Sequence, residues 1–212
     1  MTDPEDHRHV GGNGPSPDHS HMVPARVLNA VSLVFGRGAM AKCVADVARL
    51  TPADRVVDIG CGPGTAVRVA SRRCERATGV DPDPTSRRLA RWLNTLGRRH
   101  NVQIVEGSAE ALPLPDDSAT VVWSITAVHH WTDRAAGLAE ALRVLVPGGR
   151  VFLAERMSPP GARGHKRHGL TEAQLDNLEQ DTTRAGFTAV RSELHATRRD
   201  TIAVVRGSAA LV

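Results

Sequence analysis

A glycine-rich turn that follows a run of apolar residues is the part of the sequence best suited to hold a ligand. The run 56–59 leads into glycines at positions 60, 62 and 64 and then into Thr65. Glycine has no Cβ atom, so a backbone with this spacing turns sharply and lies directly against a bound molecule. A dinucleotide pyrophosphate site would read G-x-G-x-x-G, with glycine where Thr65 stands. The turn therefore indicates a ligand site of another kind and argues against an NAD-dependent oxidoreductase.

Two acidic residues accompany this turn and restrict the charge of its ligand. Asp58 lies within the apolar run, and Asp81 ends the next apolar run, 21 residues after Gly60. A carboxylate beside the turn repels a phosphate but suits an amino group or a sulfonium. An acid about 20 residues after the turn is also suited to ribose hydroxyls. Two alternatives remain: Asp58 caps the following helix, or Asp81 belongs only to the turn 81–84.

The elements that must position these residues alternate between strands and helices. Apolar runs predict strands at 56–59, 77–80, 102–105, 119–124, 150–155, 188–194 and 201–206, and amphipathic segments predict helices at 65–73, 84–96, 133–145 and from 171 to a stop at Gly186. This order predicts an α/β, Rossmann-like, seven-stranded and mostly parallel sheet with helices on both faces and strand seven antiparallel. Ligands of such sheets bind beyond the carboxyl ends of the strands.

Several local features of these elements are specific enough to be checked. Asp133 suits an N-cap, Thr171 and Gln174 form a capping box, and the segment 147–149 is expected to turn the chain into strand 150–155. In the helix 84–96 we expect one group of side chains to face inward (Leu89, Trp92, Leu93, Leu96) and another to face outward (Arg87, Arg88, Arg91).

The N-terminal region has a different composition. Pro, Gly and His dominate residues 1–21, which predicts a disordered tail. Residues 22–212 are then expected to form a single domain, with 22–50 as an N-terminal helical cap in which Val44, Val47 and Ala48 share one face. The helix around 27–38 within this cap and the loop 157–170 are expected to cover the ligand site, with Gly36 and Gly38 as hinges.

Composition excludes several classes of function. Three cysteines without C-x-x-C spacing argue against a disulfide framework and a zinc site, so we expect no metal and a cytoplasmic location. No apolar run is long enough to span a membrane. The 27 Lys and Arg residues are scattered, and Tyr is absent, which argues against a nucleic-acid partner. We expect a monomer or a homodimer.

Five segments in the right order resemble motifs of class I S-adenosylmethionine-dependent methyltransferases, and of the type 11 subfamily in particular. They are 56–65, 79–81, 106–115, 127–131 and 144–150. The resemblance spans about residues 40–205. It implies S-adenosylmethionine as the cofactor and transfer of its methyl group to a small-molecule acceptor, on oxygen or nitrogen. The alternative is a non-catalytic protein that binds the same cofactor on the same fold.

Carried over position by position, the resemblance implies a set of cofactor-binding residues. The glycine turn would face the methionine part, with Asp58 placing its amino group. Asp81 would bind the ribose hydroxyls, and Ser108 and Ala109 would lie along the adenine. Backbone at 124–125 would flank the methionine tail. The full set is Asp58, Gly60, Cys61, Gly62, Gly64, Asp81, Pro82, Ser108, Ala109, Glu110, Ser124 and Ile125.

A histidine pair supplies the candidate for catalysis. His130 is the first choice as general base, because it follows the fourth strand and relatives often hold a histidine at the matching position; His129 is the second. The alternative is a histidine that only shapes the pocket. His165 and His168 are further candidates for lining the site.

Three positions depart from what is common in the family or resemble another group. Ser108 replaces a common Asp, so we expect the contact to the adenine amino group either to be weaker or to come from Glu110. Ala119-Thr120 replaces Phe-Asp, and we expect local repacking there. A Ser-Pro-Pro segment at 158–160 follows the fifth predicted strand and not the fourth, which argues against methylation of DNA bases or glutamine amides.

Overall fold

The computed structural model describes residues 38–158, 169–197 and 200–211. The predicted tail 1–21, Gly36, most of the predicted cap and both His165 and His168 lie outside these residues. None of the described helices is long and apolar enough to cross a membrane.

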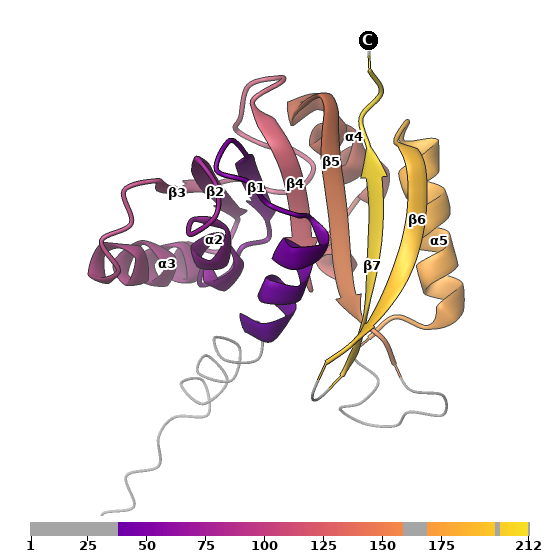
Figure 1. Ribbon diagram of the computed structural model, residues 1–212, viewed down its shortest axis with the longest axis horizontal. Coiled ribbons are helices and arrows are strands. Elements are labelled where there is room, and N and C mark those ends of the chain that lie inside the picture. Colours follow the sequence, from indigo (N-terminus) through magenta and orange to yellow (C-terminus); the bar gives the residue numbers. More distant parts are fainter. Residues whose placement is uncertain (1–37, 159–168, 198–199, 212) are drawn as a thin grey trace, which may run out of the picture.

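The strands form one seven-stranded sheet in the order β3-β2-β1-β4-β5-β7-β6 (Figure 1). They are β1 (Arg55–Ile59), β2 (Arg76–Asp81), β3 (Val102–Glu106), β4 (Ala119–Ile125), β5 (Leu145–Arg156), β6 (Thr188–Ala196) and β7 (Thr201–Ser208). Strand β7 is antiparallel to both of its neighbours, and the pairs from β3 to β5 are parallel. The predicted fold class is confirmed.

Helices cover both faces of the sheet (Figure 1). They are α2 (Thr65–Ala70), α3 (Pro84–Leu96), the short 3-10 helix η1 (Val128–His130), α4 (Arg134–Val144) and α5 (Glu172–Arg184), preceded by helical residues 38–47. Residues 38–47, α2 and α3 contribute to the core on one face, and α4 and α5 contribute to the core on the other. As predicted, Val44 and Ala48 are buried in the first core, whereas Val47 is only partly buried.

The order of the strands creates the place for a ligand. Strand β1 lies between β2 and β4, so the chain crosses from one side of β1 to the other after β3. The loops that follow β1 and β4 therefore diverge at the carboxyl edge of the sheet, and such a switch point leaves a crevice.

Helix α3 has the predicted bounds but not the predicted orientation. Trp92 and Leu96 are 58% and 63% exposed, whereas Arg87 and Asn94 are buried. The prediction of an inward-facing Trp92 and Leu96 and an outward-facing Arg87 was wrong. The guanidinium of Arg87 is drawn inward because it donates to the carbonyl oxygens of Asp81 (2.9 Å) and Pro82 (2.6 Å) and pairs with Glu106.

Other boundaries follow the predicted capping signals, with two differences. The Asp133 carboxylate accepts from the amide of Ala136 (3.1 Å), and Thr171 with Gln174 forms the predicted capping box. Helix α2 ends at Ala70, three residues early. Strand β5 begins at Leu145, directly after α4, so the expected turn 147–149 lies within this strand. The register between β4 and β5 shifts there, and Gly148 has a φ of +75°.

A buried carboxylate ties the amino ends of three strands together at the position where Ala119-Thr120 departs from the family pattern. Asp54 accepts hydrogen bonds from the Thr120 hydroxyl (2.7 Å), the Arg150 guanidinium (2.6 Å) and the amide of Thr51 (2.7 Å). Burial alone would raise the pKa of Asp54, but these hydrogen bonds hold it below its usual value. The hydroxyl of Thr120 in β4 thus donates to a carboxylate that immediately precedes β1, the neighbouring strand.

This network predicts a stability that depends on pH. Because the pKa of Asp54 is lowered on folding, its carboxylate stabilises the fold at neutral pH, and this contribution is lost as the pH falls through the lowered value. Asp54→Asn should reduce the free energy of unfolding by about 2 kcal/mol at pH 7, measured by urea denaturation, and by less near pH 3. The control Asp176→Asn, at an exposed site, should change it by under about 0.5 kcal/mol. A loss that is the same at both pH values would contradict this account.

Candidate functional site

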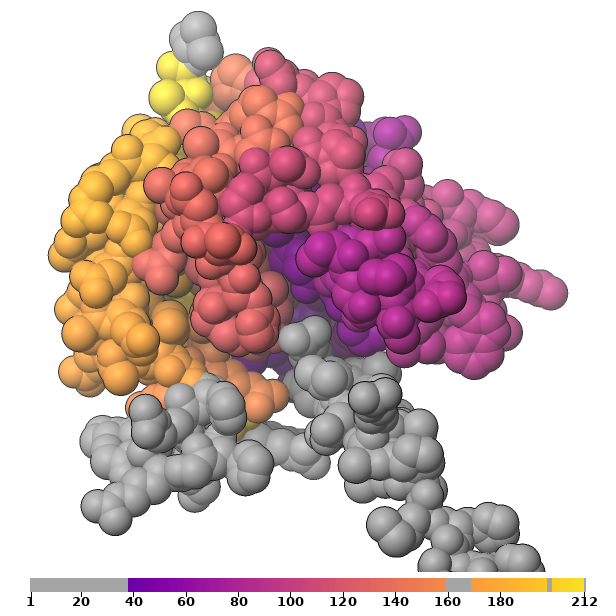
Figure 2. All heavy atoms as spheres, turned by 180° about the vertical axis from the view of Figure 1, so that it is seen from behind, coloured from indigo at the N-terminus to yellow at the C-terminus, as the bar shows by residue number. Residues whose placement is uncertain are grey.

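A cleft of about 530 Å³ opens where the loops after β1, β2, β3 and β4 meet. Its lining consists of Ile59, Gly60, Gly62, Pro63, Asp81, Pro82, Ser86, Gly107, Ser108, Ala109, Glu110, Thr126, Ala127, His130, Trp131 and Thr132. Figure 2 shows a hollow between the magenta residues of α3 and the red residues that follow β4, with indigo residues at its floor. Most of the predicted site residues therefore line a cleft at the switch point of the sheet.

The glycine turn forms a wall of this cleft in which Gly60 and Gly62 present backbone without a Cβ atom. Gly60 and Gly62 have φ values of +73° and +52°, in the left-handed region that favours glycine. A Cβ atom added to Gly60 would lie 2.5 Å from the Cβ of Ala127, in the loop that follows β4. Any side chain at position 60 would therefore clash with the loop that follows β4.

The amides of the turn are already engaged within the protein. Those of Gly60 and Cys61 donate to the carbonyl of Val80 (2.9 and 3.1 Å), and that of Gly62 donates to the Asp81 carboxylate (2.7 Å). A phosphate site relies on free amides that point at the ligand. This turn therefore offers a ligand a smooth backbone surface and a nearby negative charge, not an anion cradle, which agrees with the interpretation of its sequence.

Asp81 lies at the end of β2 and is held in place on both sides. One carboxylate oxygen accepts from Gly62, and the other accepts from the amide of Asp83 (2.9 Å). Each oxygen keeps a further lone pair, so the carboxylate remains able to accept from two hydroxyl groups of one ribose. Asp83, and not Asp81, caps α3, through bonds from the amides of residues 85 and 86. Because Asp83 caps the helix, the carboxylate of Asp81 remains available to a ligand in the cleft.

Glu110 joins the loop after β3 to the start of α4. Its carboxylate accepts from the amides of Thr132 (2.7 Å) and Asp133 (3.2 Å) and forms a hydrogen bond with the side chain of Ser108. Burial alone would raise the pKa of Glu110, but these hydrogen bonds lower it. The carboxylate therefore closes one end of the cleft, and whether it also contacts adenine, as predicted, stays a prediction.

The predicted site residues divide into two groups. Eight of them line the cleft: Gly60, Gly62, Asp81, Pro82, Ser108, Ala109, Glu110 and His130. The others stand outside this lining: Asp58, Cys61, Gly64, Ser124, Ile125 and His129. Asp58 and Ser124 are buried, and the Ser124 hydroxyl donates to the carbonyl of Ile59 (3.0 Å). Cys61 packs beneath the turn, where a Cβ on Gly79 would lie 2.7 Å from its sulfur.

The two histidines of η1 have different surroundings. His130 lines the cleft. Nδ1 of His129 lies 3.0 and 3.1 Å from the two carboxylate oxygens of Glu155, a buried residue near the end of β5. The two imidazole rings are tilted against each other, with centroids 4.0 Å apart. A carboxylate on Nδ1 favours the tautomer that leaves Nε2 able to accept a proton.

Eight lining residues were not among the predicted site residues: Ile59, Pro63, Ser86, Gly107, Thr126, Ala127, Trp131 and Thr132. Two of them, Thr126 and Trp131, have unusual features. Thr126, a β-branched residue, has a φ of +54°, a strained conformation that concentrates at functional sites. Its hydroxyl and the indole nitrogen of Trp131 are buried and have no hydrogen-bond partner among the described residues. Both residues line the cleft, and the described part of the chain leaves these two polar atoms unsatisfied. Trp131 lies in a recognised motif, but no sequence signal marks the strained backbone at Thr126.

These features fit S-adenosylmethionine. The Cβ-free wall leaves room for a flat backbone contact, Asp81 can accept from a ribose, and the surrounding carboxylates suit a cation. In the described part of the chain, Cys43, Cys61 and Cys74 form no disulfide, and no three His, Cys, Asp or Glu residues are grouped to bind a metal ion.

Comparison with known proteins shows which family the central part of the chain resembles. The family described as "Methyltransferase domain" matches residues 57–153. The 27-O-demethylrifamycin SV methyltransferase of Amycolatopsis mediterranei (strain S699) is 36% identical over 120 residues, which cover 54% of this chain and 43% of that protein. This chain spans about half or less of the length of the first curated relatives that it matches.

Solved structures share the fold. A SAM-dependent methyltransferase from Aquifex aeolicus superposes with a TM-score of 0.71 at 16% identity, covering 87% of this chain and 97% of that one. The [4+2]-cyclase SpnF gives a TM-score of 0.71 at 18% identity, covering 82% of each chain. At these identities the likeness concerns the fold alone. Residues 57–153 match the methyltransferase-domain family, and the sheet order and the glycine turn agree with the class I, Rossmann-like fold of S-adenosylmethionine-dependent methyltransferases.

Proposed function

We propose that this protein transfers a methyl group from S-adenosylmethionine to a small-molecule acceptor, on oxygen or nitrogen. The observation that carries the proposal is the bond between Asp81 and the amide of Gly62 (2.7 Å), which joins a ribose-binding acid to a Cβ-free wall in one cleft. The bound cofactor supplies an electrophilic methyl group on a sulfonium. The protein then has to hold the cofactor, orient the acceptor and exclude water.

Each wall of the cleft has a part in holding the cofactor. Asp81 accepts from the ribose hydroxyls, and Pro82 and Ala109 give the adenine apolar contacts. Glu110 keeps the adenine end closed through its bonds to residues 132 and 133. The Thr126 hydroxyl, buried without a partner among described residues, is available to the methionine part.

His130 is the proposed general base for a hydroxyl acceptor, because of the two histidines it is the one that lines the cleft. His129, fixed by Glu155, supports it from behind through the ring contact at 4.0 Å. A methyltransferase named for a demethylrifamycin is similar to this chain, which supports an organic acceptor.

Cofactor binding depends on Asp81. Asp81→Asn should weaken binding of S-adenosylhomocysteine between about tenfold and a hundredfold, measured by calorimetric titration, because a charged acceptor for two hydroxyls is lost. Asp117→Asn is the matched control: it is an exposed residue with a φ of +54°, which Asn also tolerates, and it should leave the affinity unchanged. Unchanged affinity in Asp81→Asn, or tight binding of NAD, would contradict the assignment.

Turnover depends on His130. The acceptor is first identified by incubating the protein with labelled cofactor and a metabolite extract. With that acceptor, His130→Ala should lower kcat by about a hundredfold or more while cofactor affinity stays the same, since general base catalysis contributes about 10²–10⁴-fold. His129→Ala should have a smaller effect. A larger loss in His129→Ala than in His130→Ala would assign the base to the other histidine.

The Glu110 bonds are testable without any ligand. Glu110→Gln keeps the size of the side chain but replaces the charged acceptor of the amides at Thr132 and Asp133. Hydrogen exchange at these two amides should become about tenfold faster, because each lost charge-assisted bond is worth about 1.5–3 kcal/mol. Glu75→Gln, at an exposed position, should not change these rates. Equal exchange in both variants would show that Glu110 does not close the cleft.

A non-catalytic protein on the same fold remains the alternative. SpnF, named as a [4+2]-cyclase, has this fold as well, so the fold hosts chemistry other than methyl transfer. Cofactor binding without any labelled product from the extract would favour this alternative.

A further inference from the structure

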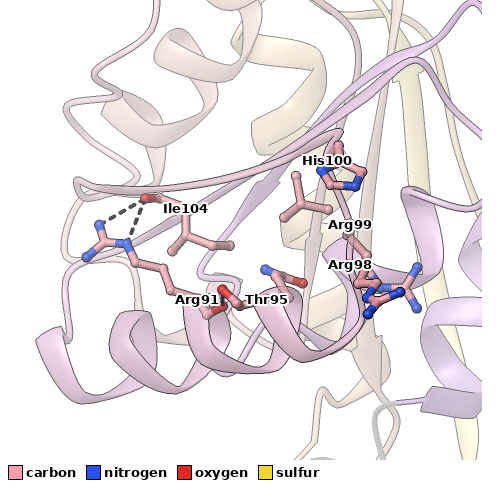
Figure 3. Close-up of a pocket in the computed structure, with 8 residues that line it drawn as sticks. Arg91, Thr95, Arg98, Arg99, His100 and Ile104 are labelled. Atoms are coloured by element: carbon pink, nitrogen blue, oxygen red, sulfur yellow. Dashed lines mark hydrogen bonds between the residues drawn. The ribbon is translucent and has the colours of Figure 1, made fainter.

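A second pocket lies between helix α3 and the edge strand β3, away from the cleft (Figure 3). It has a volume of about 350 Å³ and is lined by Arg91, Asn94, Thr95, Arg98, Arg99, His100, Val102 and Ile104. None of these residues lines the cofactor cleft. Figure 3 shows Arg91 at one end of the pocket, reaching the carbonyl of Ile104, and Arg98 and Arg99 at the other end.

The charge of this pocket is not compensated within the described part of the protein. Arg91 donates to the carbonyl of Ile104 (2.9 Å) and Arg99 to the hydroxyl of Ser71 (3.3 Å), both of which are neutral acceptors. Among the described residues, no carboxylate forms an ion pair with Arg91, Arg98 or Arg99. Burial and the nearby positive charge of Arg72 lower the pKa of Arg99. An anion placed here would relieve that repulsion.

Two buried polar groups in the pocket lack partners. Asn94 is 6% exposed, and neither its amide nitrogen nor its amide oxygen has a hydrogen-bond partner among the described residues. The Nε atom of Arg99 is likewise buried and without a partner in the described chain. Buried polar groups in proteins are normally satisfied, so unsatisfied donors beside uncompensated positive charge indicate a missing acceptor.

A purely structural explanation covers only part of these observations. Basic residues after a helix stabilise its negative C-terminal end, and residues 98–100 follow α3 directly. That helix end carries only about half a unit of negative charge, which the guanidinium groups outweigh. The explanation also leaves the buried amide of Asn94 without a partner.

We propose that the pocket between α3 and β3 binds the phosphate group of a small phosphorylated ligand. Arg98 and Arg99 supply the charged donors, since a guanidinium matches phosphate oxygens with two parallel bonds. Asn94 supplies a neutral donor from the floor. The side chains of Val102 and Ile104 contact the organic part of the ligand. A volume of about 350 Å³ is enough for a compact organic body in addition to the phosphate.

Phenyl phosphate is a suitable probe, because it joins a phosphate to a compact apolar ring. Calorimetric titration of the full chain in 150 mM chloride (about the physiological ionic strength) should show saturable binding to one site. Arg98→Gln should weaken that binding at least about tenfold, because a charge-assisted donor is lost. Arg88→Gln, an equal change of charge at an exposed position of α3, should alter it less than about twofold.

Asn94→Leu separates binding from folding. Leucine has nearly the shape of asparagine without its polar atoms, so removal of an unsatisfied amide should leave the unfolding temperature unchanged or raise it. Affinity for phenyl phosphate should fall at least about threefold in the same variant.

Three results would overturn the proposal. They are the absence of saturable binding by the wild-type chain, equal weakening by Arg98→Gln and Arg88→Gln, and binding of a single-stranded RNA oligonucleotide without binding of phenyl phosphate. Because S-adenosylhomocysteine binding involves the other cleft, it should be unchanged in these variants, so failure here leaves the proposed methyl transfer untouched.

Discussion

The hydrogen bond between the Asp81 carboxylate and the amide of Gly62 is the interaction on which the site depends. At 2.7 Å it connects the end of β2 to a turn that follows β1 and whose left-handed φ values suit glycine. The amides of Gly60 and Cys61 donate to the carbonyl of Val80 and that of Gly64 donates to the carbonyl of Cys61, so the turn does not present a row of free donors. The guanidinium of Arg87 donates hydrogen bonds to the carbonyl oxygens of Asp81 and Pro82. Asp81 thus both fixes the glycine turn and can accept hydrogen bonds from a ligand in the cleft.

Much of the fold could be predicted from local signals. The apolar runs and the capping residues Asp133 and Thr171 predicted every strand and most helix ends, because these signals act within a few residues of chain, although α2 ends three residues early and β5 begins five residues early. The orientation of α3 could not be predicted in this way. The amphipathic spacing predicted that Trp92 and Leu96 face inward, but both are exposed. Arg87 is buried because its guanidinium donates to the carbonyl of Asp81 and pairs with Glu106 at the end of β3. Such tertiary contacts override the local pattern.

The candidate site shows the same division. The glycine turn, Asp81 and the segment 108–110 were recognisable from motifs and lie together in the cleft. The pairing of His129 with Glu155 joins residues from two strand ends, and the strained backbone at Thr126 depends on packing. Neither follows from spacing along the chain. The pocket with Asn94 could not be predicted either, because along the sequence its basic residues are only part of a scattered set of Lys and Arg residues.

The most direct test of the central claim is a crystal structure of the protein with S-adenosylhomocysteine. The account predicts both ribose hydroxyls within hydrogen-bonding distance of the Asp81 carboxylate and the homocysteine part against the glycine turn. A cleft that stays empty at saturating ligand, or a ligand bound away from Asp81 and Gly62, would contradict it.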